Sequence, residues 1–297
     1  MRYNITMSKN YDKLGMFIVA LLFGFSYSFQ SLGARYIGPF AFNVGKYVVA
    51  LVTLIPFALH KTNTNRKKEI LFGLVIAAIL TAFSFLQQIV AANEEPGKVG
   101  FITTMYIVEV PLINFLFFKK KVNLQTVLGI IIALGGLFFL CDLRNLSFRL
   151  SDLITFASSL LLALEIIVLD RYCGECDTFK LNFYNFAFSL LFCIIGFALS
   201  NETFSIAAYK PALPSLLYVG FGCSTVACSI QFYCQKTLDG VTTSLILALQ
   251  SVFSTFAGYI IFDEKLSRIE LIGCVLMFIG VVLCITNQNK KIENKEG

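Results

Sequence analysis

Histidine and clustered metal-binding side chains are scarce in this sequence. His60 is the single histidine, and Cys173 and Cys176 form a lone Cys-x-x-Cys pair without a second such pair. Structural zinc usually needs four nitrogen or sulfur ligands, so we do not expect one chain to supply that site. We therefore predict no metal and no cofactor. A redox role for Cys173 and Cys176 stays open.

Several motifs of other protein classes are also missing. No Gly-x-x-x-x-Gly-Lys-Ser/Thr loop occurs, which argues against direct drive by ATP. The formal net charge of +6 is not gathered into a basic stripe with interleaved aromatic residues, so nucleic acid is not an expected partner. An enzyme would need a nucleophile with a base, paired acids or a metal, and none is evident. We predict that the protein is not an enzyme.

Charged residues are also scarce in this sequence. Only 14% of the residues are charged, whereas 57% are hydrophobic and 31 are Phe. With a mean hydropathy of +0.76, the chain could not cover its apolar surface with polar groups in water. The solvent should therefore be lipid. A helix crosses a bilayer with about 20 apolar residues, so the chain has room for roughly ten spans and no soluble domain.

The apolar runs are continuous, as in membrane helices, and lack the alternation of membrane strands. We predict an all-α membrane protein with ten transmembrane helices. The first run is span length and is expected to be an uncleaved helix. The predicted spans are 14–33, 40–59, 70–92, 99–118, 124–141, 151–169, 181–199, 212–234, 241–262 and 269–286.

Two stretches 144 residues apart resemble each other, Phe118 to Gly136 and Phe262 to Gly280. Gln87 and Gln231 correspond at the same offset. We therefore predict two five-helix repeats, residues 14–141 and 142–286. An odd number of spans per repeat makes the two copies inverted, which is typical of alternating-access carriers.

Basic residues predict the orientation. With the N-terminus inside, 16 of the 24 Lys and Arg residues fall on cytoplasmic segments. We therefore expect both tails, residues 1–13 and 287–297, to be cytoplasmic. The expected location is the plasma membrane of a bacterium.

Three segments resemble the EamA-type branch of the drug/metabolite transporter superfamily: Gly38 to Phe57, Leu86 to Val122 and Phe262 to Leu283. The resemblance covers nearly the whole chain and implies ten helices in two inverted repeats that carry small solutes. Two positions depart from the family pattern. Lys46 precedes Tyr47 where an arginine is usual, and Glu109 stands where an apolar residue is usual.

Glu109 lies near the middle of its predicted span, where an ionised acid costs about 2.5–3.5 kcal/mol. It is expected either to bind a proton or a substrate amine, or to join two helices as a protonated acid. Lys46 either reaches inward to an anionic group or snorkels to the headgroups. Glu165, close to the end of its predicted span, is a weaker candidate. At the 144-residue offset Glu109 corresponds to Phe253, so this acid has no counterpart.

Further polar residues in the spans could line a hydrated path or simply bond neighbouring helices. The candidates for binding substrate or protons are Glu109, Lys46, Tyr27, Gln30, Gln87, Tyr106, Gln231 and Gln250. The predicted function is a secondary active exporter of a small metabolite such as an amino acid, driven by an ion gradient, with protons as one option, or by the gradient of the solute itself. A passive facilitator or channel, a drug-type efflux carrier and a non-transporting receptor are the alternatives. The expected partners are a small solute and the lipid bilayer, with monomer and homodimer both open.

Overall fold

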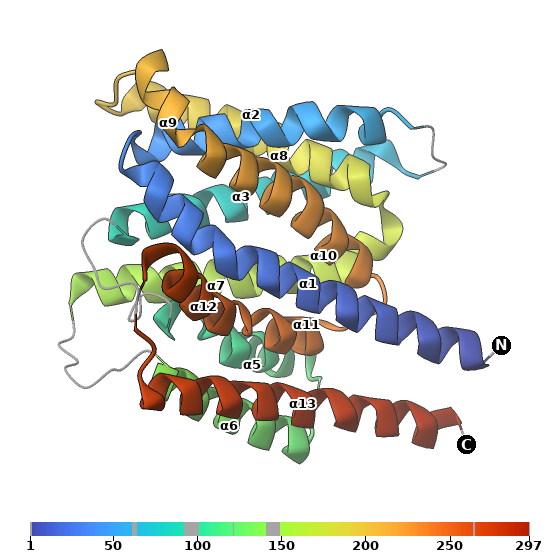
Figure 1. The fold of residues 1–297 in the computed structure, drawn as a ribbon. Helices are drawn as coiled ribbons and strands as arrows, with labels where there is room; N and C mark the ends of the chain where they lie inside the picture. Colours follow the sequence, from blue (N-terminus) through green and yellow to red (C-terminus); the bar gives the residue numbers. More distant parts are fainter. Residues whose placement is uncertain are drawn as a thin grey trace.

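The chain folds into a bundle of helices that lie side by side (Figure 1). The structure is a computed structural model that describes residues 2–60, 64–91, 101–120, 122–140, 149–263 and 265–296. Within these ranges the regular secondary structure is helical and includes no strand. The predicted all-helical class is confirmed.

The first half of the chain contains α1 (Arg2–Ala34), α2 (Pro39–Ala58), α3 (Arg66–Ala91), α5 (Tyr106–Phe118) and α6 (Leu124–Leu140). The second half contains α7 (Leu150–Tyr172), the short 3-10 helix η1 (Cys173–Glu175), α8 (Thr178–Leu199), α9 (Ile206–Leu217), the π-helix η2 (Tyr218–Ala227), α10 (Cys228–Cys234), α11 (Gly240–Leu247), α12 (Gln250–Phe262) and α13 (Arg268–Glu296). Both chain ends lie at the same end of the bundle (Figure 1).

Eight helical segments of the described chain are long and apolar enough to cross a membrane. They coincide with eight of the predicted spans. The other two predicted spans correspond to α6, a shorter apolar helix, and to the first part of α13. The chain is thus a multi-pass helical protein by length and composition.

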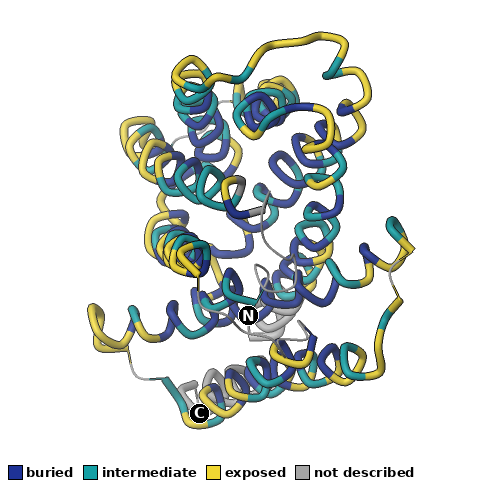
Figure 2. The backbone as a smooth tube through the Cα atoms, turned by 90° about the vertical axis from the view of Figure 1, so that its left-hand side faces the viewer, coloured by how far each residue is buried: buried dark blue, intermediate teal, exposed yellow. Residues whose placement is uncertain are grey.

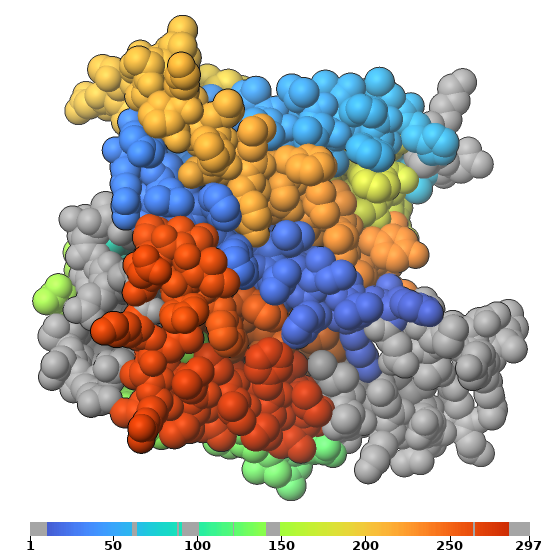
Figure 3. Space-filling view, in the orientation of Figure 1, coloured from blue at the N-terminus to red at the C-terminus, as the bar shows by residue number. Residues whose placement is uncertain are grey.

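Large apolar side chains are exposed on the outside of the bundle. Figure 2 shows that the buried parts of the backbone face the interior and the exposed parts lie outside. Val52, Phe117 and Ile260, for example, are 62%, 74% and 64% exposed. In water these side chains would be unfavourable, whereas lipid tails are as apolar as they are. Figure 3 shows α1 crossing one face of the molecule between α10 and α12.

Helices α6 and α13 pack closely because glycines meet at their contact. A Cβ atom on Gly129 would lie 2.7 Å from the Gly280 oxygen, and one on Gly136 would lie 2.7 Å from the Gly273 oxygen. Small residues let membrane helices approach until dispersion contacts form between their backbones. Every one of these glycines is thus needed to keep the pair in contact.

Two spans are interrupted at corresponding places. One span breaks at 104–105, before α5 begins at Tyr106, and another breaks at 248–249, before α12 begins at Gln250. Both second segments end at a residue in the left-handed conformation, Lys119 (φ 51°) and Asp263 (φ 53°). Each pair of features is separated by 144 residues in the sequence.

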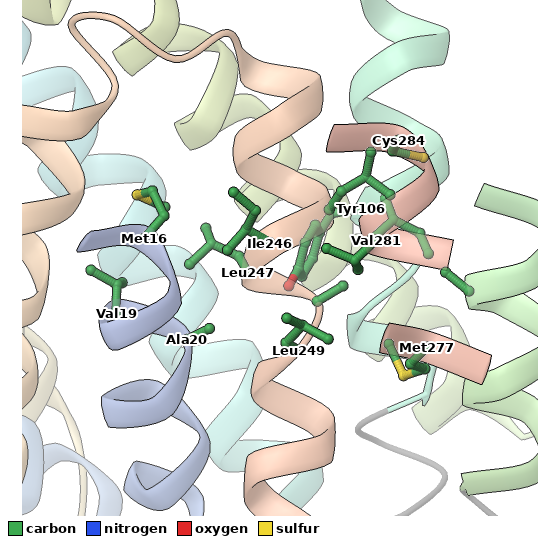
Figure 4. Close-up of a cluster of buried hydrophobic side chains, with 14 of the residues drawn as sticks. Met16, Val19, Ala20, Tyr106, Ile246, Leu247, Leu249, Met277, Val281 and Cys284 are labelled. Atoms are coloured by element: carbon green, nitrogen blue, oxygen red, sulfur yellow. The ribbon is translucent and has the colours of Figure 1, made fainter. Parts of the chain in front are cut away.

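The largest core lies around the first of these breaks. The ring of Tyr106 packs beside apolar side chains of α11 and α13, including Leu247 and Val281, and α1 contributes Met16, Val19 and Ala20 to the same core (Figure 4). The break is therefore held in place by the packing of several helices.

Candidate functional site

A cavity of about 150 Å³ lies at the centre of the bundle. Ten helical elements contribute to its wall: α1, α2, α3, α5, α7, α8, η2, α10, α11 and α12. Seven of the eight residues predicted from the sequence line it: Tyr27, Gln30, Lys46, Gln87, Tyr106, Gln231 and Gln250. An empty apolar cavity of this size holds a molecule such as benzene, so a small solute fits.

Lys46 brings a positive charge to the wall. It is 8% exposed and is the eighth residue of α2. Across the described residues no carboxylate forms an ion pair with it, and its Nζ sits 4.4 Å from the centre of the Tyr47 ring. The side chain is thus buried at the cavity wall. Binding of an anionic group by Lys46 stays a prediction.

Glu165 supplies the opposite charge from α7. Both of its oxygens accept from Gln231 Nε2, at 3.2 and 3.3 Å. Gln231 Nε2 also donates to Gln235 Oε1 at 3.3 Å, and Gln235 Nε2 donates to the carbonyl of Ile166 at 3.1 Å. This network fixes the carboxyl group in the cavity wall and leaves it without a positively charged partner in the described chain.

Tyr106 and Gln250 meet in the wall at the start of α5 and α12. Gln250 Nε2 donates to the Tyr106 hydroxyl at 3.1 Å. The two residues correspond at the 144-residue offset, so equivalent positions of the two halves contact each other. Both residues follow the helix breaks, where the backbone can change direction.

The wall also includes an unusual stretch of helix. Residues Val219, Cys223 and Ser224 line the cavity from the π-helix η2. Its hydroxyls bond carbonyls five residues back, Ser224 to Val219 at 3.0 Å and Thr225 to Gly220 at 3.3 Å. π-Helical segments are rare and frequently occur at functional sites.

Comparison with known proteins decides the family. Residues 13–141 and again residues 149–286 match the EamA-like transporter family. The chain belongs to this family. It is therefore a multi-pass membrane transporter of the drug/metabolite transporter superfamily, and its ligand is a small solute.

The names of similar proteins agree with this family assignment. An uncharacterized transporter of Archaeoglobus fulgidus is 24% identical over 273 residues, 92% of this chain and 85% of its own length. The uncharacterized transporter YoaV of Bacillus subtilis is 19% identical over 91% of this chain and 95% of its own. A crystal structure of a protein matches 96% of this chain and 99% of its own with a TM-score of 0.76 at 15% identity, which bears on the fold alone.

Glu109 lies outside the cavity of this EamA-like transporter. It is 5% exposed on α5, and its Oε2 accepts from Ser159 Oγ of α7 at 2.8 Å. Its Oε1 has no hydrogen-bond partner among the described residues. This geometry matches an acid that joins two helices. Its role in binding substrate or protons stays a prediction.

Glu165 was the weaker candidate in the sequence because its predicted span ended at residue 169. Helix α7 extends to Tyr172 and continues into η1, so Glu165 lies deeper along the helix than that boundary implied. The apolar run of this span ends at Asp170 and Arg171, but the helix continues past these two residues. Gln231 and Gln235, four residues apart, were the feature of the sequence that could have indicated a buried polar partner for Glu165.

Cys173 and Cys176 lie at the end of α7 and in the turn after it, and both are buried free thiols. Burial raises the pKa of Cys176 to about 11, with Glu69 and Glu175 adding to the effect. A thiol with a raised pKa is a poor nucleophile at neutral pH. In the described part of the chain, no group of three or more His, Cys, Asp or Glu residues is arranged to hold a metal ion.

Proposed function

We propose that this transporter is a ten-span secondary carrier of two inverted five-helix repeats, and that it exports a small zwitterionic solute such as an amino acid. One observation carries the proposal. Lys46 and Glu165 line the same cavity, where no carboxylate of the described chain pairs with the Lys46 ammonium and an amide holds the Glu165 carboxyl group. They would bind the carboxylate and the ammonium of an amino acid.

Reciprocal glycine contacts support the inverted repeat. At the 144-residue offset Gly129 corresponds to Gly273, and Gly136 corresponds to Gly280. Gly129 meets Gly280, while Gly136 meets Gly273, so each contact is the symmetry partner of the other. Self-complementary contacts of this kind indicate a twofold axis.

The order of these contacts gives the direction of the axis. Position 129 precedes 136 in α6, but their contacts in α13 come in the order 280 and 273, so the helices are antiparallel. A twofold axis that relates two antiparallel helices is perpendicular to them. For helices that cross a membrane, this axis lies in the membrane plane, as inverted repeats require.

A carboxyl group that proton and solute share would couple transport of the solute to the proton gradient. If the Glu165 carboxylate binds either a proton or the ammonium of the solute, but not both, then each entering proton releases a solute. Such competition at one site gives proton-driven export without ATP. Glu165, inside the cavity, is better placed for this exchange than Glu109, which bonds Ser159 outside it.

The experiment is transport by proteoliposomes under an imposed pH gradient, after a thermal-shift screen with amino acids, nucleosides, sugars and cationic drugs has identified a solute. We expect Glu165→Gln to lose at least about tenfold in pH-driven flux, because a charged hydrogen bond contributes about 1.5–3 kcal/mol. Glu109→Gln is the matched variant and should retain most of the flux.

If the flux driven by the pH gradient survives in Glu165→Gln but not in Glu109→Gln, the assignment of the two acids is reversed. Counterflow of labelled solute separates a carrier from a channel, since only a carrier exchanges solute for solute. Stabilisation by a cationic drug, without stabilisation by any amino acid, would favour the drug-type efflux alternative.

A further inference from the structure

One face of α8 carries polar residues along half of the helix. Thr178, Asn182, Asn185 and Ser189 are spaced four, three and four residues apart, which places them on one side. All four are buried, and the last three are fully so. We call them the α8 polar face.

The α8 polar face is poorly satisfied in the described structure. Thr178 Oγ1, Asn182 Oδ1 and both polar atoms of the Asn185 amide have no hydrogen-bond partner. A buried amide or hydroxyl without a hydrogen-bond partner is costly, and native proteins keep few such groups. Bonding between helices does not explain Asn185, because it makes no side-chain bond.

In its middle, at Asn182 and next to Asn185, the face meets the central cavity. Asn182 Nδ2 donates to the Ser224 carbonyl at 3.3 Å and to Ser229 Oγ at 3.0 Å, and Ser224 lines the cavity. Phe186, next to Asn185, lines the cavity too and stacks on Tyr47 with ring centres 5.4 Å apart. Polar groups therefore continue from the cavity wall along α8.

At its Thr178 end the α8 polar face reaches the start of α8 and of α3. Glu69 Oε1 accepts from the Asp177 backbone amide at 3.1 Å and from Thr64 Oγ1 at 2.6 Å. Glu69 Oε2 is buried and unpartnered in the described structure. From Thr178 to Ser189 the helix rises about 16 Å, roughly half the thickness of a bilayer core.

We infer that the α8 polar face lines the route between the cavity and the membrane surface at Thr178, a route for water and the zwitterionic solute. In the present arrangement α3 closes the route, since a Cβ on Gly73 would lie 2.7 Å from the Cβ of Tyr184. When the halves rock, α3 separates from α8 and water satisfies the unpaired groups. The inference rests on the proposed function, because it requires a carrier that opens to both sides.

Cysteine accessibility tests this inference without knowledge of the solute. In a variant that lacks the native cysteines, Asn182→Cys and Asn185→Cys are introduced singly into proteoliposomes and treated with a charged, membrane-impermeant methanethiosulfonate. Leu191→Cys is the control on the same helix, because Leu191 is 50% exposed on the outer surface. Ser84→Cys marks the cavity.

We expect the two polar-face cysteines to react at least about tenfold faster than Leu191→Cys, since only a thiol in water ionises readily. The reaction should occur from the Thr178 side of the membrane. If Ser84→Cys reacts while both polar-face cysteines stay as slow as Leu191→Cys, the inferred route is wrong and the proposed function stands. If Ser84→Cys is also unreactive from both sides, the cavity is not on a transport route and both proposals fail.

Discussion

Among the described residues no carboxylate forms an ion pair with the Lys46 ammonium, which is costly for a residue in the interior of a bilayer. An ammonium taken from water recovers its lost hydration only through a partner, and the described residues offer the ring of Tyr47 and no carboxylate. The cost is understandable if a solute carboxylate is the missing partner. Lys46 would then trade stability for function.

If Lys46 lowers stability in exchange for binding the solute, the effects of Lys46→Met can be predicted. The thermal midpoint of the empty protein should rise, because the variant removes an unpaired charge and retains the aliphatic stem. Stabilisation by the solute should disappear. Both quantities come from one thermal-shift titration, with Lys210→Met as the control at an exposed lysine. A lower midpoint, or solute stabilisation equal to that of the native protein, would contradict the assignment.

Cys176 gives a prediction about pH. Because burial raises its pKa to about 11, the thiol is protonated at neutral pH and gains reactivity only as the pH rises toward that value. In a variant with Cys176 as its single cysteine, alkylation by iodoacetamide should be slow at pH 8 and should accelerate well above pH 9. The unfolded protein, alkylated in detergent, is the reference. Mass spectrometry measures the rates, and rapid alkylation of the folded protein at pH 7 would revive a redox role.

At the scale of elements, the glycine contacts between α6 and α13 can be tested with adjacent residues. A Cβ on Gly136 would lie 2.6 Å from the Met277 backbone nitrogen, whereas nothing lies within 4 Å of one on Gly135. Gly136→Ala should therefore destabilise the protein by about 1–3 kcal/mol, because two backbones must separate.

Gly135→Ala should be neutral or stabilising by up to about 1 kcal/mol, since alanine is the better helix former. Thermal unfolding of the two variants in detergent provides the comparison. Equal midpoints would mean that α6 and α13 are not in contact in the folded protein.

Sequence patterns identified the elements well because a membrane span needs a long apolar run. They could not show where a span breaks, since the residues at 104–105 and 248–249 include no proline or glycine. They also could not show which way a side chain points. The sequence predicts a depth for Glu109 along its span, but depth does not define the helix face, and the acid bonds Ser159 and does not line the cavity. Glutamines and tyrosines were better guides, since all six glutamine and tyrosine candidates line the same cavity.

At the scale of the whole molecule, the arrangement of the two termini depends on α13. Both ends lie at the same end of the bundle, and α13 packs antiparallel to α6 (Figure 1). A carrier with ten spans has both termini on one side, whereas a chain in which α13 stayed outside the membrane would have nine spans and opposite termini. The location of the C-terminus therefore tests the inverted repeat.

Reporter fusions measure this directly. With green fluorescent protein, which fluoresces only in the cytoplasm of bacteria, fused to either terminus, we expect fluorescence from both fusions because basic residues concentrate on that side. Alkaline phosphatase, active only outside, should be active when inserted between α8 and α9, after Asn201, and inactive at either end. Phosphatase activity at the C-terminus alone would place it outside. The chain would then have an odd number of spans, and the repeats could not be an inverted pair of five helices each.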